Sequence, residues 1–299
     1  MKKLKIALDW TANTNHTGFY IAQQKGFYEE MGLDLEILTP SVDNYATTPA
    51  KKVELGEVDF ALCPLESVIS YRTKKKPFDA VALAALFQED ISAIATLADK
   101  NSQGPKDLDG LIYASYKARY EDEMVRQMIK NDGGKGNIEI VYPEKLGIWE
   151  TILKGKADAT WIFENWEGVR AKNEGVALKL FRMKDFGIPY SYSPIIMAGK
   201  KATENNLEEY SKFLKATKKG YLYAKDHPEE AVKVISPYVA QQDANIDLLE
   251  SQEYTSSFYG DEKTWGILEK GKVNLFLDWL KSKGLENKEL TFEDLVHTL

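Results

Sequence analysis

The stretch that decides the fold is residues 4–36, LKIALDWTANTNHTGFYIAQQKGFYEEMGLDLE. An apolar run over Leu4–Leu8 meets a polar turn over Asp9–Asn15, and a helical pattern follows over Thr17–Met31. A glycine ends that pattern, and Leu33–Leu38 alternates like a strand. This order predicts a β-loop-α-β unit whose loop lies at the carboxyl end of the first strand. Open α/β sheets bind their ligands at that end.

The predicted loop combines one large aromatic plane with several hydrogen-bonding groups. Trp10 follows the strand almost directly, and Asp9, Asn13, Asn15 and His16 surround it in the sequence. We expect such a loop to bind a flat small molecule with polar edges.

Length and composition limit the classes of protein. The chain has 299 residues, which is enough for one large domain or for two lobes with separate cores. Apolar residues make up 43% and charged residues 28%, which indicates a globular chain. The net charge of −7 argues against broad nucleic-acid binding, which needs a densely basic surface.

Cysteine content and hydropathy leave the compartment open. Cys63 is the one cysteine, so no disulfide can form within the chain. No apolar run approaches the ~20 residues that span a bilayer. The run Leu4–Leu8 contains Lys5 and ends at Asp9, and it is too short for the core of a signal peptide. We expect either a cytoplasmic protein or a mature form whose leader was removed.

Strand and helix patterns alternate along the chain, which predicts an α/β fold with largely parallel sheets. The expected strands are 4–8, 33–38, 58–62, 80–87, 91–98, 111–114, 138–142, 157–163 and 195–198, the fourth and fifth being nearly continuous. The expected helices are 17–31, 47–55, 64–75, 120–131, 148–153, 166–173, 207–225, 228–236, 246–254 and 272–283.

A weak internal echo suggests two similar lobes. GEVDFAL at 56–62 and GKADATW at 155–161 share the pattern Gly-x-x-Asp before a buried strand. We expect the chain to cross between lobes near 88–93 and 191–195. Residues 1–90 and 194–299 would then form lobe one and 91–193 lobe two, with the ligand cleft between them. Two such connections permit closure over a ligand.

Several motifs resemble a known family. They are DWTANTNHTGFYIAQQKGFYEEMGLDLEI at 9–37, GEVDFAL at 56–62, GKADATWIFENWEG at 155–168 and KDFGIPYSYSPIIMAGKK at 184–201. Together they resemble the thiamine-pyrimidine family of solute-binding proteins for ABC importers. The resemblance implies a two-lobed type II periplasmic-binding-protein fold. It also implies capture of a formylaminopyrimidine or hydroxymethylpyrimidine precursor of thiamine, although relatives take other ligands, riboflavin among them.

The same family includes fungal enzymes that make the thiamine pyrimidine, and the chain departs from them. Their lysine and histidine after the third strand would fall at Cys63 and Ser67. Their cysteine-rich iron motif would fall near 189–196, which lacks cysteine, and their phosphate loop near 115–120, which lacks glycine. We therefore predict a binding protein with no cofactor and no metal. The alternative is a pyrimidine-precursor synthase or another thiamine-biosynthesis enzyme of this fold.

Candidate site residues in the first half of the chain come from turns that follow strands. Trp10 would stack on a heterocycle, or it would be a core or hinge aromatic. Asn13 and His16 would supply hydrogen bonds, although His16 could instead cap the helix or hold the loop together. Glu66 and Ser67 stand at the start of a helix, where they would face the cleft or serve only as helix-capping residues.

The remaining candidates lie in the predicted lobe two. Tyr116 and Glu121 occupy the equivalent turn, where Glu121 would pair with an aminopyrimidine or remain a solvated helix carboxylate. Glu164 would read the ligand's amino edge and is our first choice. The flanking Trp161 and Trp166 would clamp the ring or belong to the core, and Tyr190 would close over the ligand or pack at the hinge.

We expect the partners to be a small pyrimidine-like molecule and an ABC permease, with no nucleic acid, and we expect a monomer.

Overall fold

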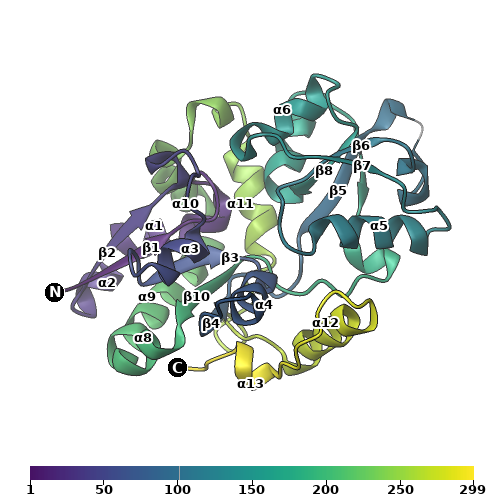
Figure 1. The fold of residues 1–299 in the computed structure, drawn as a ribbon. Coiled ribbons are helices and arrows are strands. Elements are labelled where there is room, and N and C mark those ends of the chain that lie inside the picture. The colour runs from purple at the N-terminus through teal and green to yellow at the C-terminus, as the bar shows by residue number, and fades with distance from the viewer. Residues whose placement is uncertain (101) are drawn as a thin grey trace.

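The computed structural model describes residues 1–100 and 102–299, which form two five-stranded sheets with helices around them (Figure 1). The first sheet has the order β2-β1-β3-β10-β4, and we call it lobe one together with its helices. The second has the order β7-β6-β8-β5-β9 and forms lobe two. The strands are Lys2–Ala7 (β1), Leu33–Leu38 (β2), Phe60–Cys63 (β3), Ala80–Ala85 (β4), Ser92–Leu97 (β5), Ile112–Ala114 (β6), Glu139–Val141 (β7), Ala159–Phe163 (β8), Leu178–Phe181 (β9) and Ile195–Gly199 (β10).

The helices follow most of the predicted ranges to within a few residues. They are Thr17–Gln24 (α1), Phe27–Glu30 (α2), Pro49–Glu54 (α3), Leu65–Thr73 (α4), Glu121–Asn131 (α5), Ile148–Leu153 (α6), Val169–Asn173 (α7), Lys200–Asn205 (α8), Leu207–Asp226 (α9), Pro228–Ile235 (α10), Leu248–Ser256 (α11), Lys270–Ser282 (α12) and Phe292–Leu295 (α13). None of the helices in the described ranges has the length and apolar character to cross a membrane.

The predicted α/β class is confirmed, and each sheet contains one strand that runs against the others. Strand β10 pairs antiparallel with β3 and β4, and β5 pairs antiparallel with β8 and β9. Each of these strands is the first after the chain passes from one sheet to the other. The nearly continuous strand pattern over 80–98 is therefore divided between the two sheets. The division at 90/91 and 193/194 remains our proposal for the domain boundaries.

The Gly-x-x-Asp echo corresponds to the same local structure in both sheets. Gly56 and Gly155 adopt left-handed backbone conformations, with φ of 72° and 63°, directly after α3 and α6. The Asp59 carboxylate accepts a hydrogen bond from the backbone N–H of Lys5 in β1, at 2.8 Å. The Asp158 carboxylate accepts one from the backbone N–H of Ile112 in β6, at 2.9 Å. The aspartate thus joins the central strand of each sheet to its neighbour.

Two predicted helices differ from the structure, and β9, α8 and α13 have no counterpart in the prediction. The helix predicted over 17–31 is divided into α1 and α2, because Gly26 takes a left-handed conformation with φ of 74°. The helix predicted over 166–173 begins with a wide π turn at Glu164–Gly168, and only α7 is α-helical. Strand β9 has no counterpart in the prediction, because its sequence LKLF is short and interrupted by a lysine.

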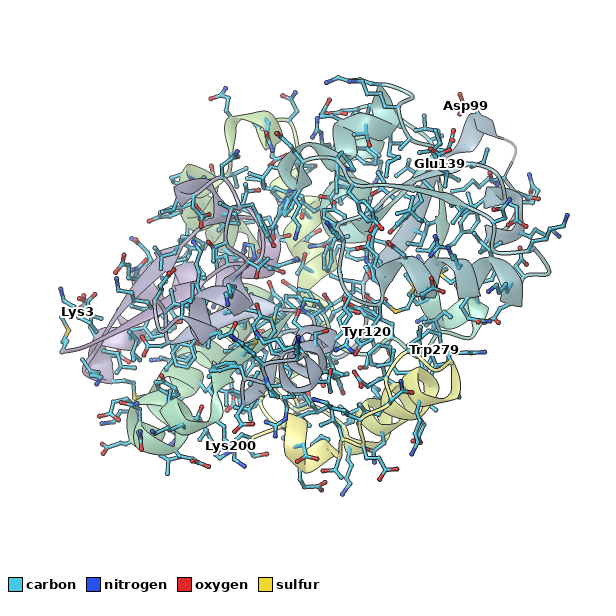
Figure 2. The ribbon with its side chains drawn as sticks, viewed as in Figure 1. Lys3, Asp99, Tyr120, Glu139, Lys200 and Trp279 are labelled. Carbon is cyan, nitrogen blue, oxygen red and sulfur yellow. The ribbon has the colours of Figure 1, made fainter. Side chains whose placement is uncertain are left out.

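The C-terminal segment contacts both lobes. The backbone N–H of His297 bonds to the carbonyl of Ala82 in β4, at 3.0 Å. The Tyr120 hydroxyl, from the turn before α5, donates to Glu286 at 2.9 Å. Tyr120 and Trp279 of α12 belong to one apolar cluster (Figure 2). Residues after α11 therefore help to hold the two lobes in this arrangement.

Candidate ligand-binding site

A cavity of about 390 Å³ lies between the lobes, where the turns after β1, β3, β6 and β8 meet. Strands β1 and β3 are parallel in the first sheet, and β6 and β8 are parallel in the second, so the carboxyl ends of each pair lie at one edge of its sheet, as the sequence predicts for a ligand site. Further walls come from the segment around Tyr45, from Lys145, and from Tyr190 and Ser193 before β10. The cavity volume falls near the lower end of the ~300–1,000 Å³ typical of small-molecule sites.

The structure brings most of the predicted site residues together. The cavity wall contains Trp10, Asn13, Glu66, Ser67, Tyr116, Glu121, Trp161, Trp166 and Tyr190. His16 and Glu164 are outside it. That the lining residues bind a ligand stays a prediction.

Aromatic rings from both lobes form the walls. Trp10 lies 6.1 Å from Tyr45 and 5.8 Å from Tyr116 between ring centroids, and the Trp10–Tyr116 contact joins the two lobes edge to face. Trp161 and Tyr190 form a second edge-to-face pair at 5.0 Å. In an edge-to-face pair, the ring that contributes its edge keeps both of its faces clear of that partner.

His16 holds the loop together and does not line the cavity. Its Nδ1 accepts a hydrogen bond from the Asn13 backbone N–H at 3.2 Å, which places the ring proton on Nε2. Nε2 then donates to the Asp9 carboxylate at 2.8 Å. His16 is completely buried. These two hydrogen bonds match the loop-holding alternative, because they position Asp9 and Asn13, and the structure places His16 outside the cavity wall where direct ligand contact was predicted.

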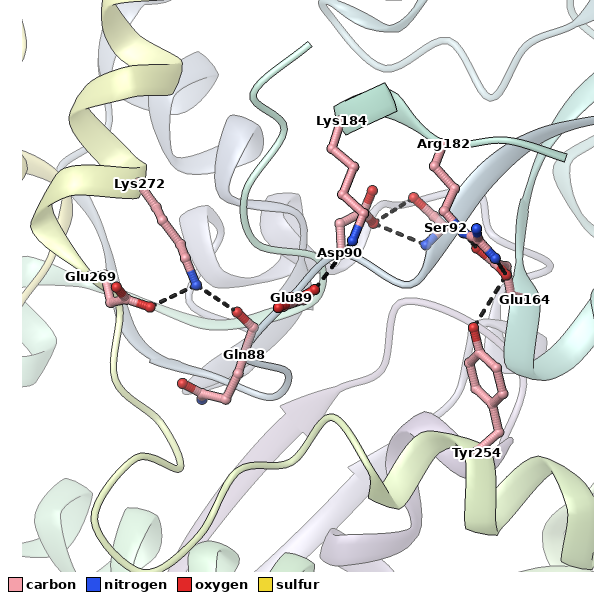
Figure 3. A network of polar contacts seen from close by, with 10 residues as sticks. All are labelled: Gln88, Glu89, Asp90, Ser92, Glu164, Arg182, Lys184, Tyr254, Glu269 and Lys272. Atoms are coloured by element: carbon pink, nitrogen blue, oxygen red, sulfur yellow. Dashed lines mark hydrogen bonds and ion pairs between the residues drawn. The ribbon is translucent and has the colours of Figure 1, made fainter. Parts of the chain in front are cut away.

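Glu164 forms an ion pair and does not line the cavity. Arg182 donates to its two carboxylate oxygens at 2.6 and 2.7 Å, and the Tyr254 hydroxyl donates at 3.2 Å (Figure 3). Arg182 directly follows the unpredicted strand β9, which pairs with β5 at the edge of the sheet. The π turn that begins at Glu164 leaves Trp166 and Glu167 as the residues that face the cavity. The structure therefore places Glu164, our first choice for the ligand's amino edge, outside the cavity wall.

Glu121 organises the turn after β6. Its carboxylate accepts hydrogen bonds from the Tyr113 hydroxyl at 2.8 Å and from the backbone N–H groups of Tyr116 and Ala118 at 3.0 and 3.1 Å. Burial raises the pKa of Glu121, against the opposite effect of these hydrogen bonds. The side chain is 1% exposed, so the solvated-carboxylate alternative is wrong.

Glu66 lines the cavity, and one oxygen of its carboxyl has no hydrogen-bond partner among the described residues. Glu66 is 3% exposed, and the unpartnered oxygen is Oε2. Pro64 occupies the N-cap position of α4, and no side chain caps that helix. Burial, with a smaller contribution from the Glu121 carboxyl, raises the pKa of Glu66 to about 8. Burial thus favours the neutral form of Glu66, which lines the cavity.

A buried polar network beside the cavity was not predicted. The side-chain amide nitrogen of Asn165 lies within hydrogen-bond distance of three oxygens, those of Thr14 at 3.0 Å, Asn15 at 2.8 Å and Thr255 at 2.7 Å, among which its two N–H groups are shared. It connects the turn after β8 with the turn after β1 and with α11, which runs between the two sheets (Figure 1). The sequence feature that could have predicted this network is the asparagine between Glu164 and Trp166, at the end of an apolar strand. Two further lining residues were not predicted: Lys145 lies three residues after the predicted strand 138–142, and Tyr45 lies in a segment without a strand-end signal.

The comparison with known proteins agrees with this geometry. Residues 13–231 match the family described as NMT1/THI5 like. The chain belongs to the NMT1/THI5-like family. The recognition made from the sequence motifs is thereby confirmed.

Relatives of this family member include binding proteins and enzymes. The formylaminopyrimidine-binding protein of Halalkalibacterium halodurans is 27% identical over 259 residues, which cover 86% of this chain and 76% of that protein. The 4-amino-5-hydroxymethyl-2-methylpyrimidine phosphate synthase THI5 of Saccharomyces cerevisiae is 23% identical over 282 residues, covering 88% and 80%.

A solved structure supports the fold. The alkanesulfonate-binding protein SsuA from Xanthomonas axonopodis, bound to MOPS, superposes with a TM-score of 0.76 at 11% identity, covering 100% of this chain and 99% of that one. The two-lobed solute-binding fold expected from the sequence is confirmed by this likeness.

Proposed function

We propose that this NMT1/THI5-like protein is a solute-binding protein that captures a thiamine pyrimidine precursor between its lobes and delivers it to an ABC permease. The observation that carries the proposal is the cavity itself, which combines aromatic walls with a buried carboxyl whose Oε2 lacks a partner. A planar ring with a polar edge satisfies both features. The formylaminopyrimidine-binding relative supports this class of ligand.

The turn after β6 favours a ligand without a phosphate. Backbone N–H groups in such a turn, before a helix, can cradle an anion. Here the Glu121 carboxylate already accepts the N–H groups of Tyr116 and Ala118, and the Lys117 N–H donates to Ser115. A phosphate at this position would have to displace a buried carboxylate, which is also negatively charged.

The alternative, a pyrimidine synthase, has less support. Its basis is the likeness to the yeast synthase. Cys63, which stands where the enzymes' lysine would fall, is buried against Met197, with a sulfur–sulfur distance of 3.6 Å. Burial raises the pKa of the Cys63 thiol, so it is a poor nucleophile at neutral pH. We therefore propose binding without catalysis.

The proposal is tested by identifying what the protein carries. Purified protein is denatured, and the released small molecules are analysed by mass spectrometry, with the Trp10→Ala variant as the control. We expect an aminopyrimidine in amounts approaching one per chain, and much less from the variant. Recovery of a sulfonate or another ligand without an aromatic ring from both proteins would refute the proposal.

A further inference from the structure

We propose, resting on the function proposed above, that Glu66 selects the ligand by binding it as a neutral carboxylic acid. Its hydroxyl would donate to a ring nitrogen, and its carbonyl oxygen would accept from the amino group on the adjacent ring carbon. The proton stays on Glu66 throughout, and no bond is made or broken.

The position of Glu66 is fixed before any ligand arrives. It lies in the first turn of α4, directly after β3. The backbone N–H of Leu65 donates to the carbonyl of Tyr192, at 2.9 Å, and the N–H of Ser67 donates to Pro64, also at 2.9 Å. Glu66 therefore enters the cavity wall from a rigid element. Its Oε2 is enclosed and has no hydrogen-bond partner among the described residues, so a ligand reaches it by a rotation of the side chain. Leaving a buried polar atom unpaired is costly, so a ligand that supplies a partner gains affinity.

The charged and titratable groups around Glu66 do not favour its ionised form. Glu121 faces it from α5, and the Cys63 thiol and the Tyr190 hydroxyl lie near it from β3 and from the segment before β10. None of these is a cation. An ionised Glu66 would therefore repel the Glu121 carboxylate, and both side chains are buried.

The cations that line the cavity are already engaged with other groups. The Lys117 ammonium lies 5.3 Å from the ring centre of Tyr142, and the Lys145 ammonium lies 4.8 Å from that of Tyr45. Arg119 forms an ion pair with Glu286 at 2.9 Å. They are placed against those groups and not against Glu66.

A neutral carboxylic acid and a carboxylate recognise different hydrogen-bonding edges of a ligand ring. A carboxylate offers acceptors alone, so it prefers two donors or a protonated ring. A neutral acid offers one donor and one acceptor side by side, which matches a neutral aminopyrimidine. An oxopyrimidine presents the same pair in reverse order, so this contact alone accepts both. It rejects a ring that lacks the exocyclic group.

The test is titration calorimetry between pH 6 and 9.5 with 4-amino-5-hydroxymethyl-2-methylpyrimidine. Glu66→Gln keeps one donor and one acceptor, whereas Glu66→Leu keeps neither. We expect Glu66→Gln to bind within about threefold of the wild type at pH 7, and Glu66→Leu to bind about 10- to 100-fold more weakly. The ratio of wild-type to Glu66→Gln affinity cancels the ligand's own protonation. It should fall about tenfold per pH unit above pH 8.

Glu167→Gln is the matched control for the pH dependence. Glu167 is another buried acid in the cavity wall, but its carboxylate already accepts the backbone N–H of Phe163 at 3.0 Å. The ligand affinity of this variant, taken relative to that of Glu66→Gln, should still fall above pH 8. Thermal melts confirm that each variant is folded, and if Glu66→Leu does not fold, the Glu66→Gln ratio decides alone.

The possible outcomes separate the two proposals. If Glu66→Gln loses as much affinity at pH 7 as Glu66→Leu, the ligand needs an ionised carboxylate and the inference is wrong. If the wild type and all variants bind equally well at every pH, Glu66 does not read the ligand, although the function stands. If the wild type does not bind the pyrimidine at all, the proposed function fails and this inference fails with it.

Discussion

Replacing Arg182 with glutamine should destabilise the protein without weakening ligand binding. The Glu164 side chain is 7% exposed and the Arg182 side chain 46% exposed, so the substitution leaves a nearly buried carboxylate with Tyr254 as its remaining partner. Breaking a fully buried pair costs about 3–5 kcal/mol, whereas exposed pairs contribute about 0–1 kcal/mol. For this half-exposed pair we expect a loss of about 2 kcal/mol.

That loss corresponds to a measurable change in melting temperature. Unfolding entropy is about 2.1 cal/mol/K per residue, so 2 kcal/mol lowers the Tm of a 299-residue chain by about 3 °C. Differential scanning calorimetry without ligand measures this. Lys184→Gln is the matched control, because the pair of Lys184 with Glu89 is exposed on both sides, and its Tm should change by less than about 1 °C.

A double variant completes the experiment. Glu164→Gln together with Arg182→Gln removes both charges, so it should recover part of the Tm lost in Arg182→Gln. The reasoning is refuted if Arg182→Gln or Glu164→Gln leaves the Tm unchanged while pyrimidine affinity falls about tenfold or more. That result would show that Glu164 binds the ligand.

Three further predictions follow from the cavity and its surroundings. Trp10→Ala should lower pyrimidine affinity about tenfold with the fold intact, because ring contacts contribute about 0.5–1.5 kcal/mol beyond area burial; unchanged affinity by calorimetry would place the ligand elsewhere. Asn165→Ala should lower the free energy of unfolding by about 1–3 kcal/mol, because buried partners lose their hydrogen bonds; an unchanged urea midpoint would contradict this. The ligand-free protein should lose stability as pH rises from about 5 to 8. The folded pKa values of Glu66, Asp90 and Glu167 are about 8, 7 and 7, above the ~4 of unfolded carboxyls, so the folded state holds more protons in that window. Urea titrations at pH 5 and 8 check the sign, and a more stable protein at pH 8 would show that other groups dominate.

The sequence predicted the parts of the fold that depend on local pattern. Apolar runs and glycine stops located β1, β2 and α3 closely, and the Gly-x-x-Asp echo marked the central strand of each sheet. Turns after parallel strands could be assigned to one edge without knowing the packing, which is why most candidate residues line the cavity. Strand β9 was missed because pairing with β5, and not its own composition, makes it a strand.

The roles of the three candidate glutamates could not be read from the sequence. All three follow strand ends, and each has an aromatic residue nearby in the chain or across the turn. Glu164 is paired because Arg182 arrives on the unpredicted β9. The Glu121 carboxylate already accepts hydrogen bonds from the N–H groups of its own turn. Glu66 is left with an unpaired oxygen. The partners of Glu121 are local, whereas those of Glu164 and Glu66 depend on tertiary contacts that no sequence spacing specifies.

Calorimetric titration of the wild-type protein with 4-amino-5-hydroxymethyl-2-methylpyrimidine at pH 7 tests the central claim most directly. A ligand of about ten non-hydrogen atoms that fills an aromatic cavity can supply about 0.8 kcal/mol per atom, which corresponds to a Kd of about 1 μM. We predict one site per chain with a Kd of about that value or lower. No binding heat up to about millimolar ligand would contradict the assignment of this cavity to a thiamine pyrimidine.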